Sequence, residues 1–249
     1  MVVKEEYLPN SQGDKKLALK AYTKDGNLPT GIGGDDKAGV FICLQLLERF
    51  NVIKGFFPVA EETGCHGSRG AKESFFNNVG YAIQFDSTEN DTMSLSLMGT
   101  QLFEQDSEFF NKTKGLILEH GFTEWRHHPY TDTMVLKERF NFSCLNFAAG
   151  YYNYHSDNEY VIVEDVLNST LLGEGVIKKL GNKFYEFIHK KKKVLLFYFI
   201  DSTGILNGTT PKSGFILNFL NLFFFSLLGI LVSFSSGLMS DKCTLPGKL

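Results

Sequence analysis

The sequence predicts an α/β protein, a three-layer α/β/α sandwich around a mostly parallel sheet with an apolar C-terminal tail. Short apolar runs at residues 53–60 and 79–86 alternate with stretches of helical spacing at 38–50 and 161–191. Such alternation is typical of helices packed on both faces of a parallel sheet. The 249 residues, 43% of them hydrophobic, are enough for one sizeable domain.

The first half of the chain supplies five elements. Turn signals flank a short strand at 17–22. Residues 38–50 are apolar nearly all round, which predicts a buried helix. The runs 53–60 and 79–86 suit buried strands, and a second helix begins near Ser68 between them.

The second half continues the pattern. Residues 107–122 indicate a helix with its exit turn, and 140–155 indicate a strand, a turn and a second strand. Residues 161–191 have helical spacing at Val163, Val166 and Leu171, although two glycines weaken it.

Composition excludes several classes of protein. The net charge of −3 gives no basic excess, so we expect no nucleic-acid partner. The four cysteines are scattered and form no C-x-x-C pair, which argues against a disulfide framework or a cysteine zinc finger. The N-terminal residues have no apolar signal-peptide core, so we expect a cytoplasmic protein.

The character of the chain changes after four consecutive lysines at 190–193. We therefore divide it into a catalytic domain at 1–190 and an apolar tail at 191–249. Within the tail, residues 215–239 carry no charge, and their length suits a membrane-spanning helix. A buried terminal helix, or a tail foreign to the parent gene, are the alternatives. A span would anchor the domain to a membrane.

Acidic residues follow three of the apolar runs. Asp35 and Asp36 precede the first helix, Glu61 and Glu62 follow residues 53–60, and Asp86 ends the next strand. Ligands bind beyond the carboxyl ends of strands in open parallel sheets, so these acids should converge there. Converging carboxylates call for a cation to offset their repulsion.

One imidazole belongs with these acids. His155 lies at the end of an aromatic-rich strand, and an imidazole beside carboxylates favours Zn²⁺, Mn²⁺ or Co²⁺. Each residue alone has a plainer interpretation. An Asp pair before a helix is commonly a cap, and a Glu pair after a strand is usually a solvated turn. The order of all four segments favours the metal site.

These segments resemble a known family. The stretches "GIGGDDKAGV", "FFPVAEETGCHGSRGA", "AIQFD" and "YYNYHSDNEYV" resemble the dinuclear zinc exopeptidases related to peptidase T and the co-catalytic zinc aminopeptidases. The resemblance covers roughly residues 25–185. It implies a phosphorylase/hydrolase-like fold, and the short interval between 86 and 155 matches the compact single-domain aminopeptidases. Residues 131–140 also resemble a segment of these enzymes, to which we assign no chemistry.

The resemblance implies a role for each site residue. Asp35 would bridge two zinc ions, and its peptide bond to Asp36 would be cis, with flanking glycines such as Gly34 relieving crowding. Glu61 would be the general base that takes a proton from the attacking water. Glu62 and His155 would be ligands of one metal, and Asp86 of the other.

One family element is missing. The family carries a further ligand, the histidine of an H-x-D motif, upstream of the G-D-D element, whereas residues 1–34 contain no histidine. We therefore expect a domain without its N-terminal strands and one zinc ion in place of two, with reduced hydrolysis. His127 and His128, or Cys65 with His66, are alternative ligands that the sequence leaves open.

Three functions remain in competition. The first is an aminopeptidase acting on short peptides. The second is a deacylase or carboxypeptidase of the same fold, and the third is an inactive remnant that binds without turnover. The substrate specificity and the oligomeric state do not follow from the sequence.

Overall fold

The computed structural model describes residues 1–9, 13–128, 131–188 and 230–234. These residues confirm the predicted α/β class, with helices and strands in similar amounts. Met1–His189 and Phe225–Leu249 group into one compact unit. Lys190–Phe224 group into a second unit, which lies outside the described residues. The boundary after residue 190 therefore stays a prediction.

The larger sheet is built from β4 (Ile53–Phe56), β5 (Val79–Ser87), β6 (Thr92–Leu97), β7 (Thr100–Gln101), β8 (Glu124–His128), β9 (Ser143–Ala148) and β12 (Ile230–Phe234). Its strand order is β4-β12-β5-β9-β6-β7, and β8 pairs with β6. Strand β5 is buried along almost its whole length, as its apolar sequence predicts. Asp86 therefore lies on a central strand, whereas Glu61 and Glu62 follow β4 at one end of the strand order.

The predicted mostly parallel sheet is wrong in this detail, because the sheet is mixed. Only the β5–β9 and β6–β8 pairs are parallel among the described strands. The connection between β5 and β6 spans only residues 88–91, and a parallel crossover needs a dozen or more. In addition, β12 pairs antiparallel with both β4 and β5. Neither feature is visible in the local hydrophobic pattern.

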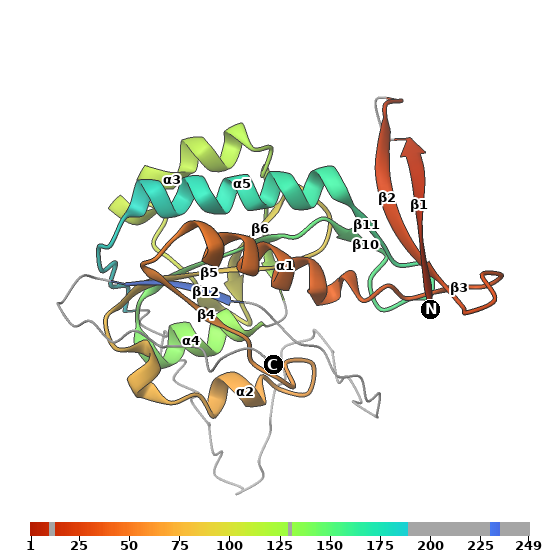
Figure 1. Cartoon of the computed structure of the whole chain (residues 1–249). Coiled ribbons are helices and arrows are strands. Elements are labelled where there is room, and N and C mark those ends of the chain that lie inside the picture. The colour runs from red at the N-terminus through yellow and green to blue at the C-terminus, as the bar shows by residue number, and fades with distance from the viewer. Residues whose placement is uncertain (10–12, 129–130, 189–229, 235–249) are drawn as a thin grey trace, which may run out of the picture. The chain divides into compact units, whose positions relative to one another are not determined.

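The smaller sheet consists of β1 (Val2–Pro9), β2 (Lys15–Tyr22), β3 (Pro29–Thr30), β10 (Tyr151–Tyr152) and β11 (Tyr160–Ile162). All its pairs are antiparallel, and β1 and β2 form the long hairpin in Figure 1. Asp165 ties this sheet to the neighbouring helix. Its carboxylate accepts hydrogen bonds from Lys16 at 2.5 Å and from the Tyr152 hydroxyl at 2.6 Å.

The helices are α1 (Gly34–Arg49), α2 (His66–Arg69), α3 (Glu108–Glu119), α4 (Asp132–Phe140) and α5 (Val163–Leu180), with a 3₁₀ turn at Glu73–Phe76. Figure 1 shows α1, α3 and α5 on one side of the larger sheet and α4 and α2 on the other. A glycine in helix α5 allows its neighbours to pack closely against the helix. A Cβ at Gly173 would lie 2.8 Å from both Leu46 and Phe85.

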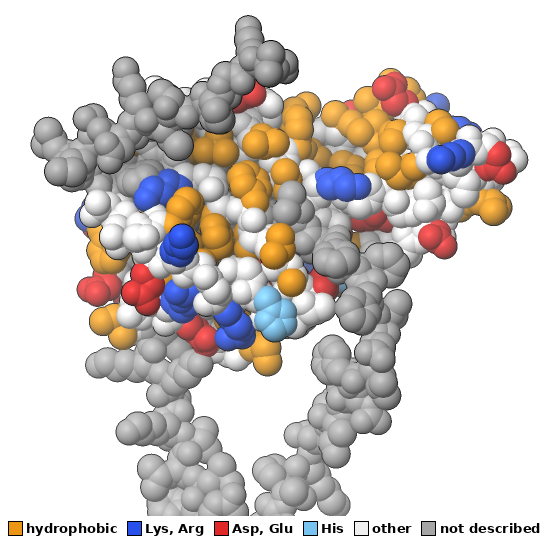
Figure 2. Space-filling model, turned by 60° about the horizontal axis from the view of Figure 1, so that its bottom comes forward, with side chains coloured by type: hydrophobic (Ala, Val, Ile, Leu, Met, Phe, Trp, Pro, Cys, Tyr) orange, Lys and Arg blue, Asp and Glu red, His pale blue; other side chains and the backbone are white. Residues whose placement is uncertain are grey.

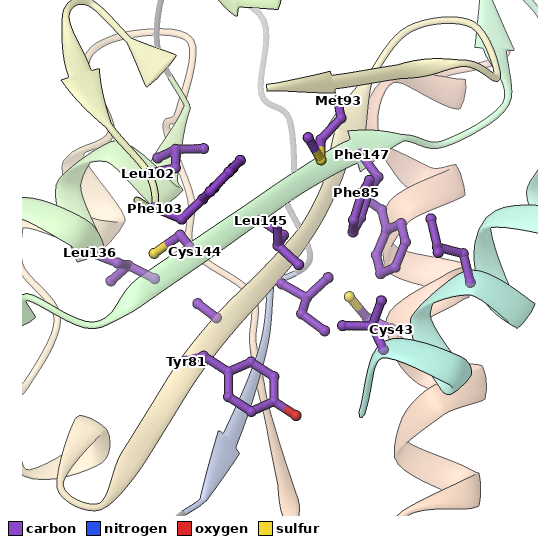
Figure 3. Close-up of a cluster of buried hydrophobic side chains, with 14 of the residues drawn as sticks. Cys43, Tyr81, Phe85, Met93, Leu102, Phe103, Leu136, Cys144, Leu145 and Phe147 are labelled. Carbon is purple, nitrogen blue, oxygen red and sulfur yellow. The ribbon is translucent and has the colours of Figure 1, made fainter. Parts of the chain in front are cut away.

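The core lies between α1 and strands β5 and β9. Figure 3 shows Leu145 and Phe147 of β9 on the side of α1, whereas Cys144 points the other way. This alternation is the period of two expected of a strand. Phe85 and Phe147 pack with ring centroids 5.9 Å apart. The packing of its buried face thus holds α1 against the sheet, and Asp35 lies in the first turn of this helix.

The predicted membrane span at 215–239 lies largely outside the described residues. Its described part, Ile230–Phe234, is strand β12. No helix among the described residues combines the length and apolarity that a membrane crossing requires.

On the face shown in Figure 2, basic and acidic side chains of the described residues are interspersed.

Candidate metal centre

Asp35, Glu62 and His155 converge at one point. Their candidate ligand atoms all lie within 4.8 Å of one another. His155 Nε2 lies 3.0 Å from Asp35 Oδ2 and 3.0 Å from Glu62 Oε1. The three residues come from the start of α1, the segment after β4 and the β10–β11 connection. The sequence-predicted ligand set of one metal is therefore assembled by the fold.

Asp35 lies on a loop that requires glycine. Gly33 has φ +71°, which glycine adopts without steric cost. A Cβ at Gly34 would lie 2.6 Å from Val161 and 2.9 Å from Tyr151, so only glycine allows the loop to lie against β10 and β11. The Asp35–Asp36 peptide bond is cis, in agreement with the family pattern.

Asp36 has a different role from its neighbour. Its side chain is buried, and its Oδ1 accepts a hydrogen bond from the Gly39 N–H at 3.2 Å. A carboxylate in this position satisfies a free N–H group of the first helical turn. Of the two aspartates, one therefore faces the metal centre and the other caps the helix. The capping interpretation of the pair is confirmed for Asp36, and the ligand role of Asp35 stays a prediction.

Glu61 and Glu62 lie in a tight turn between β4 and α2. The N–H groups of Gly64 and Cys65 both donate to the Glu61 carbonyl oxygen at 2.8 Å. This turn leaves the Glu62 side chain partly open to solvent, while Glu61 is 6% exposed. The adjacent carboxylates thus occupy different environments, because Glu62 is partly exposed to solvent and Glu61 is buried.

The Glu61 carboxyl group is hard to ionise without a cation. Burial raises its pKa to about 8, and the negative charges of Glu62 and Asp132 act in the same direction. Burial likewise raises the pKa of Asp35 to about 6, while His155 opposes that shift. Buried acids with raised pKa values in contact with other titratable groups are typical of functional sites.

Asp86 lies outside the cluster of three. It ends β5, where its backbone N–H donates to Asn146 Oδ1 at 3.1 Å and its Oδ2 accepts from Gln84 Nε2 at 3.1 Å. Burial and the charges of Asp36 and Glu61 raise its pKa well above the ordinary value. Asp86 therefore belongs to the same electrostatic environment, but it does not complete the ligand group formed by the described residues.

The backbone around the site carries several residues in the left-handed region. Ala60, Cys65 and His155 have φ values of +58°, +55° and +57°. Non-glycine residues adopt such values at a cost of about 1–3 kcal/mol each, and they concentrate at functional sites. Ala60 immediately precedes Glu61, and His155 is itself a candidate ligand, so this backbone geometry sets the two side chains.

Sequence reasoning missed two acidic residues of the site. Glu159 is 5% exposed and accepts hydrogen bonds from the Gly33 N–H at 2.6 Å and the Asp35 N–H at 2.8 Å. Asp132, at the start of α4, is fully buried, and Ser68 Oγ donates to it. Its sequence context is an ordinary helix start. The only signal for Glu159 was its position four residues after His155.

The alternative histidine ligand is placed elsewhere. His127 lies on β8, where its Nδ1 is 2.5 Å from Ser96 Oγ. It is not part of the ligand group that Asp35, Glu62 and His155 form.

The arrangement suits a divalent cation with an open coordination position. Two carboxylates and one imidazole are borderline to hard ligands, and three protein ligands are typical of catalytic zinc sites. His155 is more than half exposed, so solvent and a substrate can reach the ligand atoms. Next to them lies one buried carboxylate, Glu61, of the kind used for proton transfer.

Comparisons with known proteins find similarity in structure but none in sequence. No protein-family profile matches the sequence, and no curated protein matches it. Among solved structures, the chain is similar to the aminopeptidase APDkam598 from the archaeon Desulfurococcus kamchatkensis, with 15% identity and a TM-score of 0.42. The match covers 66% of this chain and 52% of that protein, so the chain spans about half of its length.

Proposed function

We propose that this protein hydrolyses peptide bonds with the help of a bound metal ion, as an aminopeptidase acting on short peptides. The observation that carries the proposal is the convergence of Asp35, Glu62 and His155 within 4.8 Å, beside the buried Glu61. The order of the sequence segments supports it, because three of the four segments contribute residues to that arrangement.

The ligand set fits one zinc ion, with Mn²⁺ or Co²⁺ as alternatives. Asp35, Glu62 and His155 would hold it, and it would polarise the scissile carbonyl and acidify the attacking water when bound. A second metal would have only Asp35 and Asp86 among the residues of the predicted set. We therefore propose a centre that binds one ion tightly, and metal analysis finding two tightly held ions would contradict this.

Glu61 is the group that we propose to move the proton. Its burial excludes competing water and raises its pKa, and a cation nearby would favour the ionised form that can accept a proton. It would accept a proton from the attacking water and deliver it to the leaving amine. Asp132 would keep Glu61 basic through its negative charge.

The surplus of negative charge favours a substrate with a free amino group. Burial is the main cause of the raised pKa values of Glu61 and Asp86, and neighbouring carboxylates raise both further, so acids crowd this part of the site. One divalent cation offsets only part of this excess. A peptide N-terminal ammonium would be attracted to the remainder, whereas a terminal carboxylate would be repelled.

The test is a hydrolysis screen of the full chain with Zn²⁺, Mn²⁺ or Co²⁺. It compares dipeptides with a free N-terminus against N-blocked dipeptides, and wild type against Glu61→Gln. We expect cleavage of the free dipeptides and a loss of about 10²–10⁴-fold in the variant. Preference for blocked substrates would instead indicate a deacylase or carboxypeptidase. Equal inactivity of the two proteins with metal bound would indicate a binding remnant.

A further inference from the structure

Glu159 is a buried carboxylate that, among the residues the structure describes, is held by backbone N–H groups and forms no ion pair. Its Oε2 accepts from the Gly33 N–H at 2.6 Å, and its Oε1 accepts from the Asp35 N–H at 2.8 Å. Both oxygens are therefore used, and both donors belong to the loop that carries one candidate metal ligand. Hydrogen bonds to an ionised acceptor are about twice as strong as neutral ones.

The loop is shaped to receive this carboxylate. Its glycines bring the backbone close, since a Cβ at Gly31 would lie 3.6 Å from Oε2 and one at Gly34 would lie 3.4 Å from Oε1. With Gly33 in the left-handed region, N–H groups of the turn point toward one side. Backbone N–H groups that converge in this way bind anions, and here the Gly33 and Asp35 N–H groups bind a carboxylate of the same protein.

Glu159 also belongs to the connection that carries His155. Within it, the Glu159 N–H donates to the Ser156 carbonyl at 3.2 Å, and Ser156 Oγ donates to the Asn153 carbonyl at 2.6 Å. These bonds close the turn on which His155 lies. Glu159 therefore fixes the backbone of Asp35 to the turn that holds His155, although the two ligands are far apart in sequence.

We propose that Glu159 is a positioning residue of the metal centre, which sets the separation of Asp35 and His155 by anchoring one loop to the other. The inference rests on the metal site proposed above. Groups that orient metal ligands change metal affinity by about 10–100-fold when they are removed. Glu159 does so without contacting the metal, because its carboxylate is occupied by the two N–H groups.

The experiment measures Zn²⁺ affinity of the full chain by chelator competition, for wild type, Glu159→Gln and Glu159→Asp. The glutamine has the same shape but turns one N–H₂ group toward a donor, so one hydrogen bond is lost. The aspartate keeps the charge but is one methylene too short to reach both donors. Asp157→Asn is the matched control, because it removes an exposed charge from the same turn.

We expect both Glu159 variants to bind Zn²⁺ about 10–100-fold more weakly. The Asp157→Asn control should change affinity less than about threefold, because exposed charges are screened. If Glu159→Asp binds Zn²⁺ within about threefold of wild type, the proposal is overturned, because the negative charge alone would then be enough.

Amide hydrogen exchange of the metal-free proteins gives an independent result. The Gly33 and Asp35 amides should exchange about tenfold or more faster in Glu159→Gln than in wild type, with other amides of α1 unchanged. Unchanged exchange at these two amides would also overturn the proposal. If wild type binds no Zn²⁺ at all, the proposed function fails, while the exchange result still decides the role of Glu159 in anchoring the loop.

Discussion

The buried Glu61 carboxyl makes the stability of the metal-free protein depend on pH. Its pKa is about 8 rather than the ordinary 4.5. An acid with a higher pKa in the folded state binds more protons there than in the unfolded state. Stability therefore falls as the pH rises from about 4.5 to about 8. Glu61→Gln removes this ionisation, so we expect the variant to be more stable than wild type in alkaline solution.

The size of the effect follows from the pKa. Raising it from 4.5 to about 8 corresponds to about 4–5 kcal/mol of destabilisation at pH 9, at about 1.4 kcal/mol per pKa unit. Burying a poorly satisfied glutamine amide costs about 1–3 kcal/mol, so the net gain is about 2 kcal/mol. For a protein of this size that raises Tm by about 4–8 °C. At pH 5 the wild-type penalty is only about 1 kcal/mol, so the gain disappears or reverses.

Thermal unfolding in EDTA at pH 5, 7 and 9 measures this difference. Glu119→Gln serves as the control, because it makes the same substitution at an exposed position at the end of α3 and should leave stability nearly unchanged. A Glu61→Gln variant that is no more stable than wild type at pH 9 would refute the reasoning, as would an equal gain at all three pH values. Either result would show that the Glu61 carboxyl is not buried among other acids.

Three further predictions concern the ligands and the scaffold. His155→Ala should weaken Zn²⁺ binding by more than about 100-fold in chelator competition. The Zn²⁺ affinity of wild type should decrease when the pH is lowered below about 6, because protons then compete with the metal for Asp35. Gly39→Ala should destabilise by about 1–3 kcal/mol or more in urea, because its Cβ would lie 2.1 Å from the Phe85 carbonyl oxygen. Gly115→Ala, where the space is open, should instead be neutral or stabilising, and equal effects would contradict the packing of α1 on β5. Arg139→Ala should cost about 1–3 kcal/mol and speed amide exchange in α2, because its guanidinium donates to the Ser68 and Ala71 carbonyls, and unchanged exchange would speak against this brace.

The local elements could be predicted because each depends on a short pattern. The apolar run that ends at Asp86 forms β5, and the helical spacing after Val163 forms α5. The direction of the strands could not be predicted in the same way. The direction of β6 depends on the short connection from β5, and the antiparallel pairs of β4 and β5 depend on β12, a strand from a distant part of the sequence.

For the site, the residue types and their order indicated the ligands. Asp35, Glu62 and His155 were predicted together, and the structure brings them together. Asp86 was grouped with them because it also follows a strand, yet its side chain is engaged by Gln84 instead. A strand end places a residue at an edge of the sheet, but the direction of its side chain depends on its neighbours.

The sequence by itself therefore determined the α/β class, the elements and the chemical character of the metal site, because these follow from periodicity and from carboxylates that need a cation. Only the tertiary structure decided which aspartate of the pair caps the helix and how little of Glu61 is exposed to solvent. It also decided that Glu159 binds the loop that carries Asp35. Those properties depend on contacts between segments more than 100 residues apart, and on burial, and neither is encoded in any short stretch of sequence.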